Sequence, residues 1–288
     1  MPLVRSLLTA MLLAGVGLVT GCASDTGSSG AEAPAFTDTL TLDTKADSVA
    51  HRLLEAHGAD ALASAPYLRF NFAVETPGGT QVVGRHLWNR ETGDYRVEWS
   101  QGADSSYVAI VNVRDVNDDV PSGTAYLNGS ELEGDAGRQA REDAYGRFVN
   151  DTYWLLVPFK TFDSGVNRTY LPDSSTAGHD VLHLTFGDVG LTPDDQYWLY
   201  VSTETGRLDR WAFHLQGMPD DASPRAYDWT GYETLQAPNG SVKLSTRKES
   251  LGGDTAILTN QLALPSSPPE GAFSTGEPML TADENEGS

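Results

Sequence analysis

The stretch YLRFNFAVE (residues 67–75) alternates apolar and polar side chains. Leu68, Phe70, Phe72 and Val74 share one face, while Arg69, Asn71 and Glu75 share or flank the other. A period of two is typical of a β-strand that is buried on one side only. The sequence therefore predicts a half-buried strand here, and it provides the pattern against which the rest of the chain is compared.

Stretches of similar length recur through most of the chain, and turn residues separate them. Further strands are predicted at 81–90, 94–101, 105–114, 123–127, 166–171, 179–186, 195–203, 207–216, 225–233, 241–248 and 255–264. PGG (77–79) and PNG (238–240) are hairpin signals, and Glu-Thr-Gly ends at Gly93 and again at Gly206. Glycine after a type I turn takes the left-handed conformation that such connections need. Many short strands joined by short turns predict an antiparallel meander.

Two helices are expected beside the strands. Thr44 precedes apolar residues at helical spacing, and Gly58 follows them, which predicts a capped helix between the two. Residues 135–150 place Ala136, Ala140, Ala144 and Phe148 four apart, which predicts a surface helix with a thin apolar stripe. NDTYWLLVPFKTFD (150–163) follows directly. Because Pro158 blocks a continuous helix, we expect residues 152–157 to form a turn or two that pack beside the sheet as a compact plug.

The N-terminus has the plan of a bacterial lipoprotein signal. Arg5 is followed by an uncharged run from Ser6 to Gly21, shorter than the ~20 residues that span a bilayer. Val19-Thr20-Gly21 before Cys22 resembles a lipobox, which implies cleavage after residue 21 and lipidation of Cys22. Acyl chains there would anchor the chain in the membrane. Alanine at position 23 rather than aspartate implies the outer membrane, with the domain facing the periplasm.

The composition divides the rest of the chain into three parts. Residues 22–44 are rich in Ser, Gly and Ala and are predicted to be a flexible tether. Residues 45–264 are long enough for one domain with its own core. Residues 265–288 are poor in core-forming residues and are predicted to be a disordered tail.

The net charge restricts the possible partners and describes the surface that faces the solvent. With 40 acidic and 19 basic residues, the formal charge is −21, which excludes nucleic acid as a natural partner because no basic footprint is present. An acidic surface of this kind fits either a high-salt environment or an ordinary secreted protein, and the sequence does not separate the two.

The order of elements resembles that of the LolA/LolB-like superfamily of periplasmic lipoprotein carriers. DTYWLLVPFKTFDSGV, DVLHLTFGDVGLTPDDQYWLYV and TGRLDRWAF resemble bacterial lipoproteins of unassigned role grouped with it. The resemblance implies a mainly β, α+β fold: a curved antiparallel sheet of about 11 strands that forms an incomplete barrel. An N-terminal helix and an inserted helical lid would cover its concave face. Arg69 and Arg96 are the strand candidates for the arginine that the carriers place in their cavity.

The same resemblance implies an apolar ligand, a lipid or an acyl chain, held in the half-barrel. Trp154, Leu155 and Leu156 would then point into the hollow as the lid, while Asp151 and Lys160 stay in water. The residues expected to bind the ligand are Phe70, Phe72, Trp99, Trp154, Leu155, Leu156, Trp198 and Trp211.

Catalytic signatures are missing from the sequence. It has no G-x-S-x-G, H-E-x-x-H or C-x-x-C motif and no phosphate-binding loop, so we expect no enzyme, cofactor or metal. His179 and His183 lie too far apart on one strand to share a metal, and DVNDDVPSG (115–123) lacks the glycine and glutamate of an EF-hand. Two functions remain. One is an outer-membrane lipoprotein that binds a lipid, another apolar ligand or a lipidated partner. The other is a structural or protein-interaction lipoprotein of the cell envelope without a small-molecule site.

Overall fold

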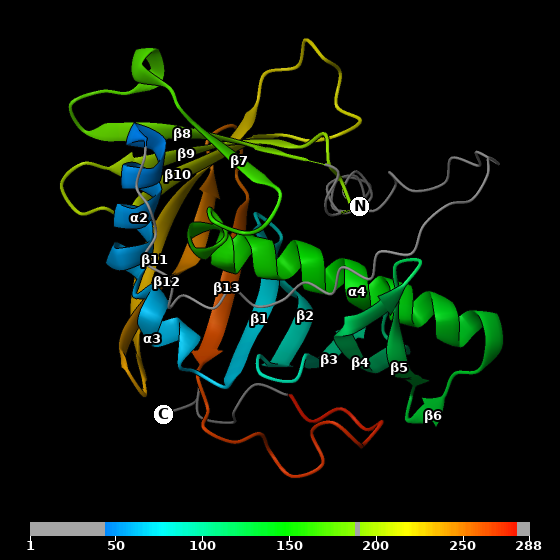
Figure 1. Cartoon of the computed structure of the whole chain (residues 1–288). Helices are drawn as coiled ribbons and strands as arrows, with labels where there is room; N and C mark the ends of the chain where they lie inside the picture. The colour runs from blue at the N-terminus through cyan, green and yellow to red at the C-terminus, as the bar shows by residue number, and fades with distance from the viewer. Residues whose placement is uncertain (1–43, 188–190, 281–288) are drawn as a thin grey trace, which may run out of the picture.

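The computed structural model describes residues 44–187 and 191–280, and these form one curved antiparallel sheet with helices on its concave face (Figure 1). The sheet is not closed into a barrel, as predicted. Its elements in chain order are α2 (Lys45–His57), α3 (Ala59–Ala63), β1 (Tyr67–Thr76), β2 (Gly79–Asn89), β3 (Asp94–Ser100), β4 (Ser106–Asn117), β5 (Val120–Leu127), β6 (Ser130–Glu131), α4 (Gly134–Leu156), η1 (Val157–Phe159), β7 (Val166–Tyr170), η2 (Pro172–Ser174), β8 (His179–Phe186), β9 (Gln196–Ser202), β10 (Leu208–His214), β11 (Arg225–Ala237), β12 (Gly240–Ser250) and β13 (Ala256–Ala263).

The sheet consists of two meanders, β1–β6 and β7–β13, which are joined by the pairing of β1 with β13. The strand order is β6-β5-β4-β3-β2-β1-β13-β12-β11-β10-β9-β8-β7, so the first strand of the chain pairs with the last. The two edge strands, β6 and β7, are therefore neighbours in sequence but lie at opposite ends of the sheet. α4 connects them, and its 23 residues span about 34 Å at 1.5 Å per residue. The topology thus directs this helix across the concave face.

The predicted turns are confirmed. Gly93 and Gly206 both have positive φ, 86° and 72°, and the amide of each donates to the carbonyl oxygen four residues earlier. The N-terminal helix is also confirmed. Thr44 accepts a hydrogen bond from the Asp47 amide at its start, and Gly58 ends it at φ 79°.

The second helix is longer than predicted. α4 does not stop at residue 150 but continues through the apolar stretch to Leu156, so the expected separate plug is the last turn of this helix. Pro158 lies in the 3₁₀ turn that follows, where its missing N–H costs nothing. The helix begins over β4 and β5, where Ala140 and Ala144 are buried against Tyr95, Val97 and Ala109.

The C-terminal prediction is wrong for the described part of that segment. Residues 265–280 lie against the convex face of β1–β3 instead of being disordered, and residues 281–288 lie outside the described residues. Arg96, which is wholly buried, donates to the carbonyl oxygens of Ala272 and Thr275 at 3.1 and 2.7 Å. The carboxylate of Glu98 accepts the amide of Leu280. Buried polar side chains thus hold a segment that has few apolar residues of its own.

Candidate functional site

The concave face beneath the C-terminal half of α4 is an aromatic core. The Trp154 ring lies 4.6 Å from that of Trp211 on β10 and 4.9 Å from that of Tyr227 on β11, both edge to face. Phe213 is 5.8 Å away. Edge-to-face geometry of this kind is favourable beyond the area that it buries. Helix and sheet are therefore joined by interlocked rings.

Six of the eight residues predicted to bind the ligand belong to this buried interface. Phe70 and Phe72 on β1 and Trp211 on β10 face inward, and Trp154, Leu155 and Leu156 come from α4. Trp99 on β3 also faces inward, but it belongs to a second cluster with Ala140 and Ala144 of the N-terminal half of α4. All seven are at most 5% exposed. Whether they bind a ligand stays a prediction.

Trp198 does not belong to this surface. Its neighbours on β9, Tyr197 and Leu199, face the core, so Trp198 faces the convex side. There its ring stacks on that of His183 at 4.9 Å. The expectation that it lines the concave face is wrong, because successive side chains of a strand point to opposite faces.

Neither arginine proposed as the cavity arginine lies on the concave face. Arg96 is directed to the C-terminal segment, as described above, and Arg69 on β1 donates to the carbonyl oxygen of Leu280 at 3.1 Å. Both therefore belong to the convex side of the sheet, and that suggestion is wrong.

A buried polar pair joins the middle of α4 to the sheet. His86 Nε2 on β2 lies 3.2 Å from Asp151 Oδ2 on the helix, close but not aligned as a hydrogen bond. Its Nδ1 contacts the Tyr95 hydroxyl at 2.5 Å, and the ring stacks on Phe70 at 4.3 Å. Burial lowers the pKa of His86, although the Asp151 carboxylate acts in the opposite direction.

The expectation for Asp151 is therefore wrong: it is 2% exposed rather than in water. Its partner is distant in sequence, so no local pattern could reveal it. Lys160 is half-buried, with its ammonium 3.3 Å from the Asp163 carboxylate.

Polar donors without acceptors lie deeper under the helix. The Tyr153 hydroxyl and the Trp211 and Trp229 indole N–H groups are buried and have no hydrogen-bond partner. The rings form a chain, with 6.1 Å from Tyr153 to Trp211 and 6.3 Å from Trp211 to Trp229. At its end the Lys248 ammonium lies 4.7 Å from the Trp229 ring centroid. We refer to Tyr153, Trp211, Trp229 and Lys248 as the donor cluster. One indication of this cluster was present in the sequence. Lys248 is an even number of residues from Val242 and Leu244 on the same strand, so it is expected on their buried face.

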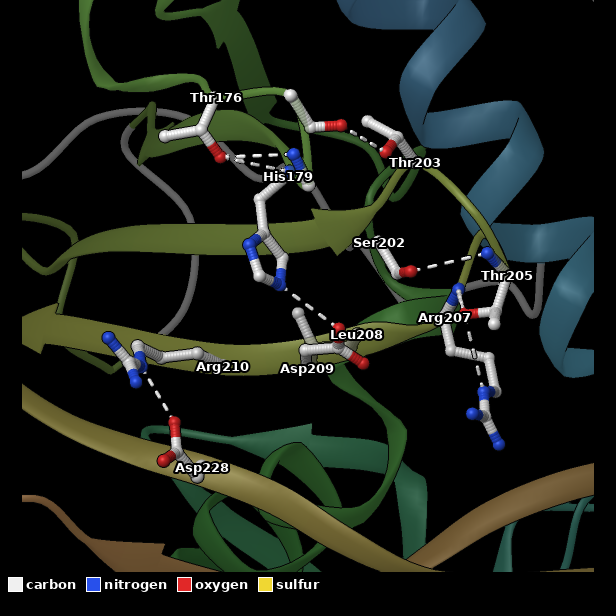
Figure 2. Close-up of polar contacts among 12 residues, drawn as sticks. Thr176, His179, Ser202, Thr203, Thr205, Arg207, Leu208, Asp209, Arg210 and Asp228 are labelled. Carbon is white, nitrogen blue, oxygen red and sulfur yellow. Dashed lines mark hydrogen bonds and ion pairs between the residues drawn. The ribbon is translucent and has the colours of Figure 1, made fainter.

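The convex side of β8–β11 carries a shallow polar hollow of about 400 Å³. Figure 2 shows the His179 ring directed at Asp209, with 3.0 Å between Nε2 and Oδ2, and Arg210 beside Asp228, with 2.6 Å between Nε and Oδ1. Arg210 and Asp228 thus neutralise each other at the surface. A second hollow, of about 440 Å³, lies between the β4–β5 turn and Arg138 and Arg141 of α4, and its lining is also mainly polar.

No group of three potential metal ligands occurs among residues 44–187 and 191–280. His183 contacts Gln196 Oε1 at 3.0 Å, away from the ion pair of His179. Asp118 and Asp119 both have positive φ, 50° and 61°, in the two-residue turn between β4 and β5. That segment therefore forms a tight hairpin, as its turn chemistry favours.

In structure the chain is similar to an outer membrane lipoprotein-sorting protein domain from Vibrio parahaemolyticus, with 10% identity, 78% of this chain and 97% of that chain covered, and a TM-score of 0.38. A DUF1329 family protein from Desulfovibrio piger is 11% identical over 79% of this chain and 96% of that one, with a TM-score of 0.44. MucB is 14% identical over 80% of this chain and 62% of that one, with a TM-score of 0.22.

No protein-family model and no curated protein matches the chain. At these identities and TM-scores, the likenesses assign no ligand or partner to the chain.

Among the described residues, no helix is long and apolar enough to cross a membrane. The predicted signal peptide, the tether and Cys22 lie outside the described residues.

Proposed function

We propose that this chain is a lipid-anchored protein of the cell envelope that binds an apolar ligand between α4 and the concave face of its sheet, without catalysing a reaction. α4 is then the lid that a ligand displaces. The observation that supports this most directly is the donor cluster: a buried lysine and three buried donors without partners lie where a single helix crosses an apolar surface. The cell-envelope location rests on the lipobox at Cys22 and remains part of the proposal.

Displacement of the lid is energetically plausible because an acyl chain can replace what the helix loses. A buried tryptophan removes roughly 150–250 Å² from water, worth about 4–6 kcal/mol at 25 cal/mol per Å². Each methylene that enters the same surface contributes about 0.8 kcal/mol, so some five to eight of them offset the withdrawal of Trp154. Closer to its N-terminus α4 is held by Ala140, Ala144 and the ring of Phe148, which lies 5.0 Å from the rings of Trp88 and Tyr95. The proposal therefore requires only the C-terminal turns of α4 to move.

Gly84 provides a way to loosen the lid without touching the apolar surface. A Cβ at this position would lie 2.6 Å from His86 Nε2 and 3.3 Å from Asp151 Oδ2, between the sheet and α4. Gly84→Ala should therefore weaken the docking of the helix and increase binding of an apolar fluorescent dye. Gly146 lies on α4 itself, and a Cβ there would meet no atom within 4 Å, so Gly146→Ala is the control.

The test combines this dye titration with mass spectrometry of organic extracts of the full chain purified from envelopes. The proposal expects a co-purified amphiphile in the wild-type protein and a dye response that rises for Gly84→Ala and not for Gly146→Ala. An extract without lipid, together with equal dye responses in all three proteins, would refute it.

A second function, a structural or protein-interaction lipoprotein, is favoured by one observation. The concave face is filled by the protein's own side chains, with Trp154, Leu155 and Leu156 between 0 and 4% exposed. This function expects a specific protein partner in cross-linked envelopes and no extracted lipid, so the same preparation distinguishes the two.

A further inference from the structure

Lys248 is a buried lysine on the inward face of β12. Its side chain is 0% exposed. It pairs across the strands with Trp229 on β11 and Ile257 on β13, and Ile257 in turn pairs with Val74 of the inward row of β1. The ammonium therefore lies on the same face as Phe72 and Trp211, beneath the lid.

Its contacts are all neutral. Nζ donates to the Ser245 carbonyl oxygen at 2.7 Å and to the Thr259 hydroxyl, and it lies over the Trp229 ring. Among the described residues no carboxylate contacts it. A buried charge without a counter-charge costs several kcal/mol, and proteins usually avoid this arrangement.

A structural role does not account for the residue. The Thr259 hydroxyl itself donates to the Ser245 carbonyl oxygen at 2.8 Å, so that acceptor is satisfied without the lysine. Removing the amine would leave no buried acceptor unpaired, and a methionine of similar length would fill the space.

Beside Lys248 lies a chain of rings whose donors have no partners. These donors are the indole N–H groups of Trp229 and Trp211 and, farther along, the hydroxyl of Tyr153, and all three residues are buried or packed against the core. An anionic head group with several oxygens is the kind of group that accepts from an ammonium and from neighbouring N–H donors, and bonds to a charged acceptor are the stronger kind.

We propose that the donor cluster binds the anionic head group, a carboxylate or a phosphate, of the amphiphile that lies beneath α4, with Lys248 as its counter-charge. This inference rests on the proposed function and adds the chemical class of the ligand. The acyl part would follow the apolar row of Trp211, Phe213 and Trp154, which leads from the lysine to the helix.

The test is native mass spectrometry of the full chain released from detergent micelles. Wild type, Lys248→Met, Lys248→Arg and Lys243→Met are compared, the last because Lys243 is an exposed lysine on the same strand. We expect a bound anionic amphiphile in wild type and Lys243→Met, at least a tenfold loss in Lys248→Met, and partial retention in Lys248→Arg. The adduct mass distinguishes a fatty acid from a phospholipid.

Thermal unfolding separates a binding role from a structural one. After bound amphiphile has been removed from both proteins, Lys248→Met should unfold at an equal or higher temperature than wild type, because it removes a buried charge that only a ligand neutralises. A lower unfolding temperature would assign Lys248 to the fold and overturn the inference. Equal amounts of anionic amphiphile in wild type and Lys248→Met would overturn the inference alone. The absence of any amphiphile from all four proteins would overturn the proposed function with it.

Discussion

Acid should destabilise this protein through His57 at the end of α2. Its ring is held at both nitrogens: Nδ1 lies 2.9 Å from the Lys243 carbonyl oxygen, and Nε2 accepts the Leu208 amide at 3.3 Å. Only the neutral ring with its proton on Nδ1 satisfies both contacts. Burial lowers the pKa of His57 from 6.5 to about 4, and the charges of Arg207 and Lys243 contribute to the decrease.

The sign and size of the effect follow from this difference. Because the folded pKa is lower than the unfolded one, the unfolded chain binds more protons, and stability falls as the pH drops from about 6.5 toward 4. Each pKa unit is worth about 1.36 kcal/mol, so the complete loss is roughly 3.4 kcal/mol. Between about pH 7.5 and pH 5, about 2 kcal/mol of this loss in the free energy of unfolding occurs. The lower limit of that window stays above the isoelectric point of 4.4.

The assay is urea unfolding of wild type, His57→Gln and His51→Gln at both pH values. Glutamine does not titrate but can still donate and accept. His51 is the half-buried histidine of the same helix, with its Nδ1 3.4 Å from the Glu55 carboxylate. Wild type and His51→Gln should each lose about 2 kcal/mol more than His57→Gln on acidification. Contributions of His86 and of the carboxylates are common to all three proteins and cancel. If His57→Gln loses as much stability as wild type, the reasoning about the buried ring is wrong.

Three further predictions test the fold. Arg96→Met leaves Glu98 buried without its guanidinium partner, so we expect the free energy of unfolding in urea to fall by about 3–5 kcal/mol. Proteolysis within residues 265–280 should also be faster, and cleavage at the wild-type rate would contradict the role given to this arginine. Gly123→Ala should lower the free energy of unfolding by ~1–3 kcal/mol or more, because φ is 135° and a Cβ would meet the Ile110 carbonyl oxygen at 2.2 Å. Chemical denaturation measures this, and unchanged stability would show that β5 can shift. Thr44→Ala removes the acceptor of the Asp47 amide and should cost about 1 kcal/mol, measured by thermal unfolding, with no change in stability as the opposing result.

The sheet could be predicted because its signals are local. The period of two in β1 and the glycine turns at Gly93 and Gly206 depend only on neighbouring residues, and the structure places them as the sequence indicates. The outward direction of Trp198 was available from the same rule, since Tyr197 and Leu199 flank it and both are buried. The error arose because Trp198 was assigned to the concave face without applying this alternation to β9.

The remaining errors concern contacts between residues that are far apart in sequence. A charged residue beside an apolar run is normally expected to be exposed to solvent. Asp151 is buried instead, because His86 on β2 lies opposite it. Residues 265–280 have too few apolar side chains to order themselves. They are held by Arg96 and Glu98. The period of two in β3 places both side chains on the convex face, but no local pattern reveals that the C-terminal segment lies against them.

The buried pair under α4 has a purpose that apolar packing alone does not provide. Ala140 and Ala144 pack on the sheet without a preferred direction, while Arg141 and Arg147 of the same helix donate to the Pro121 and Val83 carbonyl oxygens at 3.0 Å. The contact of Asp151 with His86 is formed in one register only, and leaving either group buried alone would be costly. A ligand that lifts the helix must therefore compensate for this polar contact as well as for the apolar area. An anionic head group near Lys248 would form a polar interaction that replaces the lost contact of Asp151 with His86. An alkyl chain by itself forms no such interaction.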